Sequence, residues 1–140
     1  MTVSIGITGI GTYFPEKIEK AADLVTATGI PEHILRDKMG INQRHVAGEM
    51  DSVSAMASKA GKNAIINAGI TPEQIKMVIS HGSEYKDHIV WNAAGKIQHE
   101  VGAVNAYAFE MYALCAGAPI AINLAKSMMM ADESLDYVRL

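Results

Sequence analysis

The chain of 140 residues has one cysteine, few aromatic residues and no long apolar run. A single cysteine excludes an internal disulfide and any metal site built from several cysteines. No apolar stretch approaches the ~20 residues that a membrane helix requires, and the first residues lack the charged and apolar regions of a signal peptide. We therefore expect a cytoplasmic protein that does not contact a membrane.

An excess of positive charge is also absent, because the net charge is -3. Neutralising nucleic-acid phosphates requires a clustered excess of Lys and Arg, so we expect no nucleic-acid partner. Basic residues gather in the first third of the chain, where they could meet a phosphate or an acidic carrier protein, although their spacing alone favours solvated surface charges: Lys17, Lys20, Arg36, Lys38 and Arg44. The five histidines show no metal-ligand spacing, and we expect no metal site.

Hydrophobic residues make up 49% of the chain and aromatic residues 6%. This composition is typical of a globular protein with an aliphatic core, and the length fits one domain. Apolar periodicity predicts strands at residues 3–10, 77–80, 106–111 and 137–140. It predicts helices at residues 21–28, 31–38, 52–68 and 91–101, a capped turn at 71–74, and a last helix through Ile120, Leu124 and Met128.

The helix at residues 52–68 is the most regular, with a predicted buried face of Val53, Met56, Ala60, Ala64 and Ile65. Strands and helices alternate along most of the chain. This order predicts an α/β fold with a mixed, largely parallel sheet that is covered by helices on both faces.

Cys115 lies where the strand at residues 106–111 gives way to the last helix. The amino end of a helix carries free N–H groups and a partial positive charge, which favour a thiolate. Such a thiol can accept an acyl group while its own N–H stabilises the tetrahedral oxyanion. From the residues alone, a small core cysteine is the alternative interpretation.

Three segments resemble one enzyme family. Residues 111–117 (MYALCAG) are similar to the cysteine signature of β-ketoacyl-acyl-carrier-protein synthase III, residues 7–15 (ITGIGTYFP) to its first strand and loop, and residues 40–45 (GINQRH) to its Gly-Ile-x-x-Arg-His motif. The segments occur in the family's order and the resemblance covers nearly the whole chain. It implies the amino-terminal half of a thiolase-like fold, as one domain over residues 1–140.

The resemblance implies an acyltransferase. In this family an acyl group passes from acyl-CoA to the cysteine, here Cys115, and is then condensed with malonyl-acyl-carrier protein. Lys38 and Arg44 are implied in binding coenzyme A, and Val90 matches a position that limits acyl-chain length in the neighbouring subunit of a homodimer. The coenzyme A thioester is the substrate, and no cofactor is implied.

Two alternatives remain open from the sequence. Residues 82–84 (GSE) also resemble the segment with the acid/base glutamate of 3-hydroxy-3-methylglutaryl-CoA synthases, which makes Glu84 a second catalytic candidate. The other alternative is a non-catalytic binding or assembly module with an idle cysteine.

The histidine and asparagine that activate the malonyl donor belong to the second half of the family's chain, and nothing here matches them. We therefore expect this chain to be inactive in condensation by itself. We also expect it to aggregate or dimerise through apolar surface that the second half would cover.

Overall fold

The computed structural model describes residues 4–82 and 86–140. Their contacts divide the chain into two compact units. Unit 1 contains the described residues up to Tyr13 together with Val53–Leu140, and unit 2 is Phe14–Ser52. Cys115 lies in unit 1.

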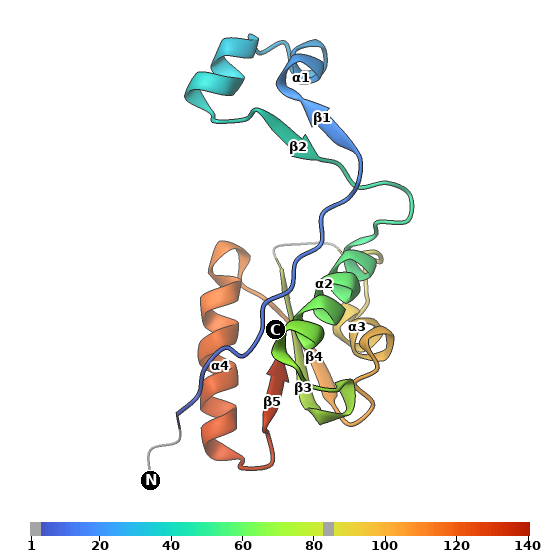
Figure 1. Ribbon diagram of the computed structural model, residues 1–140, viewed down its shortest axis with the longest axis vertical. Helices are drawn as coiled ribbons and strands as arrows, with labels where there is room; N and C mark the ends of the chain where they lie inside the picture. Colours follow the sequence, from blue (N-terminus) through green and yellow to red (C-terminus); the bar gives the residue numbers. More distant parts are fainter. Residues whose placement is uncertain (1–3, 83–85) are drawn as a thin grey trace. The chain divides into compact units, whose positions relative to one another are not determined.

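The centre of unit 1 is a three-stranded sheet in the order β4-β3-β5 (Figure 1). Its strands are β3 (Ile75–Gly82), β4 (Tyr107–Tyr112) and β5 (Tyr137–Arg139). β3 pairs with both neighbours in parallel, with Met77 opposite Tyr107 and Ile75 opposite Tyr137. The predicted strands near 77–80, 106–111 and 137–140 are therefore confirmed, as is the parallel sheet.

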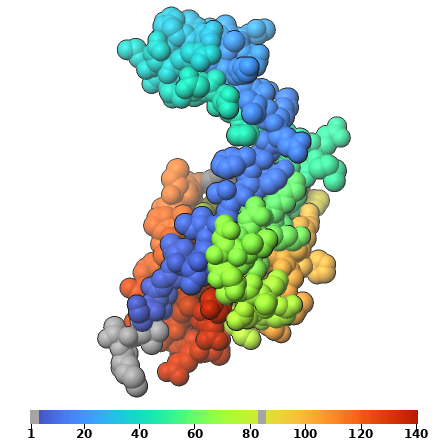
Figure 2. All heavy atoms as spheres, viewed as in Figure 1, coloured from blue at the N-terminus to red at the C-terminus, as the bar shows by residue number. Residues whose placement is uncertain are grey.

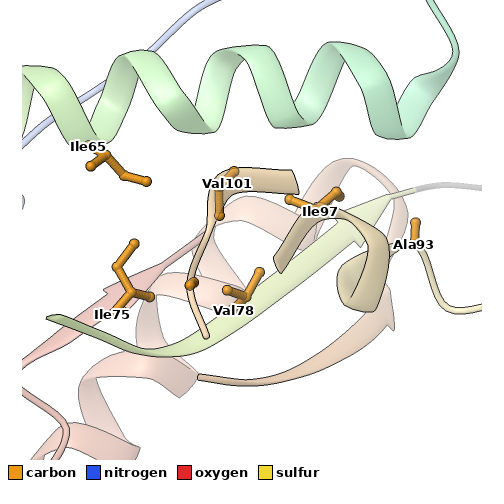
Figure 3. Packing of buried hydrophobic residues seen from close by; sticks show 7 residues of the cluster. Ile65, Ile75, Val78, Ala93, Ile97 and Val101 are labelled. Atoms are coloured by element: carbon orange, nitrogen blue, oxygen red, sulfur yellow. The ribbon is translucent and has the colours of Figure 1, made fainter. Parts of the chain in front are cut away.

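Helices cover both faces of β3, because its side chains alternate between two apolar clusters. Val78 packs with residues of α2 (Val53–Ala68) and α3 (Ala93–Val101), which lie on the same face of the sheet (Figure 3). Met77 and Ile79 pack with Ala121 and Ala125 of α4 (Gly117–Ala131) on the other face. This arrangement confirms the expected covering of both faces.

The buried face of α2 differs from the predicted one. Its buried residues are Ser54, Ser58, Gly61 and Ile65. Of these, only Ile65 belongs to the predicted face. Small residues permit close approach: a Cβ on Gly61 would lie 2.7 Å from Nε of Arg139. Apolar periodicity identifies large side chains and misses a face selected for its small ones.

The predicted strand at residues 3–10 is wrong over the part that the structure describes. Residues 4–13 run extended across unit 1 and pair with no strand in the described ranges (Figures 1 and 2). The side-chain amides of Asn67 and Asn63 on α2 donate to the carbonyls of Ile10 at 2.8 Å and Thr12 at 2.9 Å. This segment, whose apolar residues alternate, therefore forms hydrogen bonds with side chains of α2 in place of a neighbouring strand.

Unit 2 contains α1 (Ala21–Thr28), as predicted, ended by Gly29 with a φ of 70°. The predicted helix at 31–38 is largely a π-helical turn, η1 (Ile34–Lys38). β1 (Ile18–Lys20) and β2 (Gln43–His45) form an antiparallel pair that the sequence did not predict. Three-residue strands are too short to produce a detectable period.

Two further predicted elements are present in unit 1. The predicted turn at 71–74 is the 3₁₀ turn η2 (Pro72–Gln74), with Thr71 as its cap. The predicted helix at 91–101 is α3, and Oδ1 of Asn92 accepts from the N–H of Ala94 at 2.9 Å. α3 therefore begins beside the carboxyl ends of β3 and β4.

Candidate active site

A short turn connects β4 to α4 and contains Cys115. The turn is η3 (Leu114–Ala116), and α4 follows at once from Gly117. The thiol of Cys115 is free and the residue is exposed. The structure therefore confirms that this cysteine lies at a strand-to-helix junction and is open to solvent, where the helix amino end favours negative charge.

Leu114, directly before the cysteine, has a φ of 50°. This left-handed conformation costs a residue with a Cβ about 1–2 kcal/mol. Strained residues of this kind persist where the surrounding structure holds them in place. The turn is closed by the N–H of Ala116, which donates to the carbonyl of Ala113 at 3.0 Å.

His81 supports the turn from β3. A Cβ on Gly117 would lie 2.8 Å from Nδ1 of His81 and 3.5 Å from its Cβ, so the imidazole packs directly against the first residue of α4. His81 is half-buried and lies beside the first residue of the helix that follows the cysteine.

A buried ion pair lies on the other face of the same strand ends. The ammonium of Lys86 contacts the carboxylate of Glu110, and their side chains are only 7% and 6% exposed. Lys86 also donates to Oγ of Ser80 at 2.8 Å. The second carboxylate oxygen of Glu110 accepts from the N–H of Ala93 at 3.2 Å, at the start of α3.

Two residues beyond this pair complete its surroundings. Lys86 Nζ lies 5.3 Å from the ring centroid of Tyr112, the last residue of β4. A Cβ on Gly82 would lie 2.7 Å from Cε of Lys86, so the glycine makes room for the lysine chain. Lost solvation and the Glu110 carboxylate both raise the pKa of Tyr112 above its ordinary value.

Sequence reasoning did not identify this cluster. The only signal was Glu110 itself, a carboxylate inside an otherwise apolar strand, which requires a partner when it is buried. Nothing in the sequence identified Lys86 as that partner.

Lys38 and Arg44, the implied coenzyme A ligands, both lie in unit 2. Arg44 donates to Oε2 of Glu19 at 2.9 Å, and the Arg44 hydrogen bond lowers the pKa of the Glu19 carboxyl. Lys38 is exposed, and its side chain forms no ion pair with another residue in the described ranges. Their implied roles stay predictions.

The other predicted site residues are Val90 and Glu84. Val90 is 95% exposed, and its implied role in a neighbouring subunit stays a prediction. Glu84 lies outside the described residues. Within the described ranges, no three His, Cys, Asp or Glu residues come together as a possible metal site.

A cavity of about 420 Å³ lies between the extended segment, α2, α4 and β5, and Cys115 is not among its lining residues. Arg139 reaches it, with Nη2 donating to the Ala57 carbonyl at 2.7 Å. Burial lowers the pKa of Arg139 to about 10. The cavity is therefore separate from the chemistry of the thiol.

One stretch, Leu114–Ala131, is long and apolar enough to cross a membrane by length and composition alone. This differs from the sequence expectation that no stretch approaches that length. A mostly buried core helix meets the same criteria; 17% of this stretch is buried in the structure, including Ala121 and Ala125, which pack against β3.

Solved structures define the class of fold. The chain matches 3-oxoacyl-[acyl-carrier-protein] synthase III from Aquifex aeolicus with a TM-score of 0.82 and 26% identity, over 89% of this chain and 40% of that one. It matches the synthase III from Thermus thermophilus with a TM-score of 0.81 and 26% identity, over 91% and 39%. The chain has a thiolase-like α/β fold.

Curated relatives agree, although no family model matches the chain. β-Ketoacyl-[acyl-carrier-protein] synthase III of Ruegeria pomeroyi is 30% identical over 128 residues, which are 91% of this chain and 39% of that enzyme. The enzyme of Rickettsia rickettsii is 32% identical over 127 residues, 91% and 40%. Acetoacetyl CoA synthase NphT7 of a Streptomyces species is 34% identical over 121 residues, 86% and 36%.

The chain is thus similar to the amino-terminal part of β-ketoacyl-acyl-carrier-protein synthase III enzymes. It spans about two fifths of the length of the curated relatives that it matches. The comparisons do not favour 3-hydroxy-3-methylglutaryl-CoA synthase or a non-catalytic module.

Proposed function

We propose that the chain forms the acyl-accepting part of a synthase III type condensing enzyme. The observation that carries this proposal is the exposed thiol of Cys115 on a strained turn at the amino end of α4. The relatives named as synthase III and acetoacetyl CoA synthase support the same class of reaction.

In the proposed step, the thiolate of Cys115 attacks the carbonyl carbon of an acyl-CoA thioester. A bond forms between that carbon and Sγ, and the tetrahedral oxyanion is stabilised by backbone N–H groups at the start of the helix. The bond to the coenzyme A sulfur then breaks, and coenzyme A leaves as a thiolate that takes up a proton. The acyl group remains on the enzyme as a thioester.

The rest of the cycle extends the proposal to partners. The acyl group is condensed with malonyl-acyl-carrier protein, using residues that the family resemblance assigns to its second half. Lys38 and Arg44 would contact the coenzyme A phosphates, since both are exposed cations. We further propose a cytoplasmic homodimer, in which Val90 would meet the acyl chain of the neighbouring subunit. The thioester is the substrate, and no other cofactor is part of the proposal.

Incubation with acetyl-CoA followed by intact-mass measurement tests the acyl-accepting step. We expect one acetyl adduct on the chain and none on Cys115→Ser, because an alkoxide is far harder to form at neutral pH than a thiolate. Circular dichroism of both proteins serves as the control for folding. A folded chain that takes up no acetyl group, or a Cys115→Ser variant that takes up as much, would contradict the proposal.

A further inference from the structure

The buried pair of Lys86 and Glu110 has a cost that a purely apolar strand end would avoid. Both side chains are almost wholly removed from water, and desolvating two charges offsets much of their mutual attraction. Such a pair is weak support for stability, and fixing one geometry is the best-attested use of buried polar groups. The question is which geometry this pair fixes.

The contacts of Lys86 converge on the ends of both strands that precede the site. Ser80 and Glu110 are cross-strand partners in the register of β3 and β4, and so are Gly82 and Tyr112. Lys86 touches all four: it bonds to Ser80 and Glu110, lies near the ring of Tyr112 and fills the space beside Gly82. One lysine side chain therefore contacts the carboxyl-terminal parts of both strands.

Tyr112 leads directly into the turn with the thiol. Only Ala113 and Leu114 separate Tyr112 from Cys115, so the Cα atoms of Tyr112 and Cys115 lie at most about 11 Å apart. The other side of the turn is held by His81 against Gly117. A strained residue such as Leu114 persists only where the surrounding structure holds it, and Lys86 contacts the end of β4 that precedes it.

We propose that Lys86 is a positioning residue for acyl transfer to Cys115, acting through Glu110 and Tyr112 on the turn that presents the thiol. Where the acyl donor is acyl-CoA, this inference rests on the proposed function. The lysine contacts no acyl group. Its role is to keep the backbone N–H groups of the turn aligned with the oxyanion that forms on the thiol.

Two reactions of the Cys115 sulfur distinguish an effect on the alignment of the turn from an effect on the accessibility of the thiol. Acyl transfer passes through an oxyanion whose stabilisation depends on aligned N–H donors. Alkylation by iodoacetamide forms a bond from sulfur to carbon as iodide leaves, and it builds no oxyanion. Misalignment of the turn therefore slows the first reaction and spares the second.

The principal variant is Lys86→Met, which keeps a side chain of similar length and removes its charge. Lys76→Met, in β3, is the matched control. We expect Lys86→Met to lower the maximal rate of Cys115 acetylation by roughly tenfold to a hundredfold. The acetyl-CoA concentration at half-maximal rate and the iodoacetamide rate should stay within about twofold to threefold. Lys76→Met, which replaces a lysine without an ion pair among the described residues, should change none of these.

A second variant covers the case in which Lys86→Met does not fold. Glu110→Gln keeps the side-chain shape and one acceptor oxygen, for Lys86 or for the N–H of Ala93, and replaces the other charged oxygen with an amide donor. It should lower acetylation in the same direction by a smaller factor. Circular dichroism establishes that each variant is folded before its rates are compared.

The same comparison with 4-nitrophenyl acetate separates this inference from the proposed function. This ester also forms an oxyanion on acylating Cys115, with 4-nitrophenolate leaving, and it contains no coenzyme A. If acetyl-CoA fails on the parent chain, the proposed function fails, and the ester still tests Lys86. A folded Lys86→Met with unchanged ester acylation, or with acylation and alkylation reduced equally, would overturn the positioning role.

Discussion

At the scale of single residues, the turn before Cys115 is defined by one unfavourable backbone conformation. Leu114 combines a positive φ with a side chain that is 64% exposed. Its side chain contributes little burial to offset the backbone cost. The residue thus stores strain directly beside the thiol.

Replacing Leu114 with glycine is expected to raise the free energy of unfolding by about 1 kcal/mol, because glycine adopts a positive φ without steric cost. Urea denaturation measures the change, with Leu114→Ala as the matched control that keeps the Cβ and therefore the strain. A glycine variant no more stable than the alanine variant would show that the turn is unstrained.

The sequence singled out Cys115 through the resemblance of residues 111–117 to a cysteine signature; the meeting of a strand pattern and a helix pattern at this residue left a small core cysteine as an alternative. It could not identify Lys86 or His81, whose importance comes from contacts across neighbouring strands and with the first residue of α4. Such contacts depend on register, and the sequence alone does not determine which residues of two strands face each other. Glu110 was detectable only as a charge in an apolar strand.

At the scale of elements, the extended segment and α2 depend on two glycines. A Cβ on Gly11 would lie 2.1 Å from the Ala60 carbonyl oxygen and 2.2 Å from the Ala64 nitrogen. A Cβ on Gly9 would lie 2.6 Å from the Ala64 oxygen. These are backbone atoms of a helix, which cannot move aside as a flexible side chain would.

Gly11→Ala is therefore expected to lower the free energy of unfolding by roughly 1–3 kcal/mol through overpacking. Gly6→Ala is the matched control, since a Cβ there meets nothing within 4 Å. It should leave stability unchanged or raise it by up to about 1 kcal/mol. Thermal or urea unfolding compares the two. Equal effects of the two substitutions would mean that the segment does not pack closely on α2.

The two errors at this scale have a common physical origin. Alternation at residues 3–10 predicted a strand, and apolar periodicity in α2 predicted a face of larger side chains. In both cases the structure uses small residues for close approach: Gly9 and Gly11 on the segment, and Ser54, Ser58 and Gly61 on the helix. Hydrophobic patterns carry no direct signal for such contacts.

At the scale of the whole molecule, the order of strands and helices was sufficient to predict an α/β fold with a parallel sheet. Parallel strands require crossover connections, and the helical segments between strands supply them. The division into two units was not predicted: charged residues are denser in residues 14–52, but no flexible linker marks the borders of this segment.

Hydrogen exchange should follow the layers of unit 1. β3 pairs on both sides, and Met77, Val78 and Ile79 are wholly buried, so their amides should exchange most slowly. The amides of Gln43–His45, in an exposed strand of unit 2, should exchange far sooner. Mass-resolved exchange at neutral pH compares the two. Similar rates in both strands would contradict the assignment of β3 as the centre of the sheet.

The parallel pairing of β3 has a consequence during synthesis on the ribosome. β3 is complete at Gly82, yet its first partner begins at Tyr107 and its second at Tyr137. At about 5–20 residues per second, the nascent chain presents an unpaired apolar strand for seconds before either partner emerges. That interval is when a chaperone would bind this segment to keep newly made chains from aggregating.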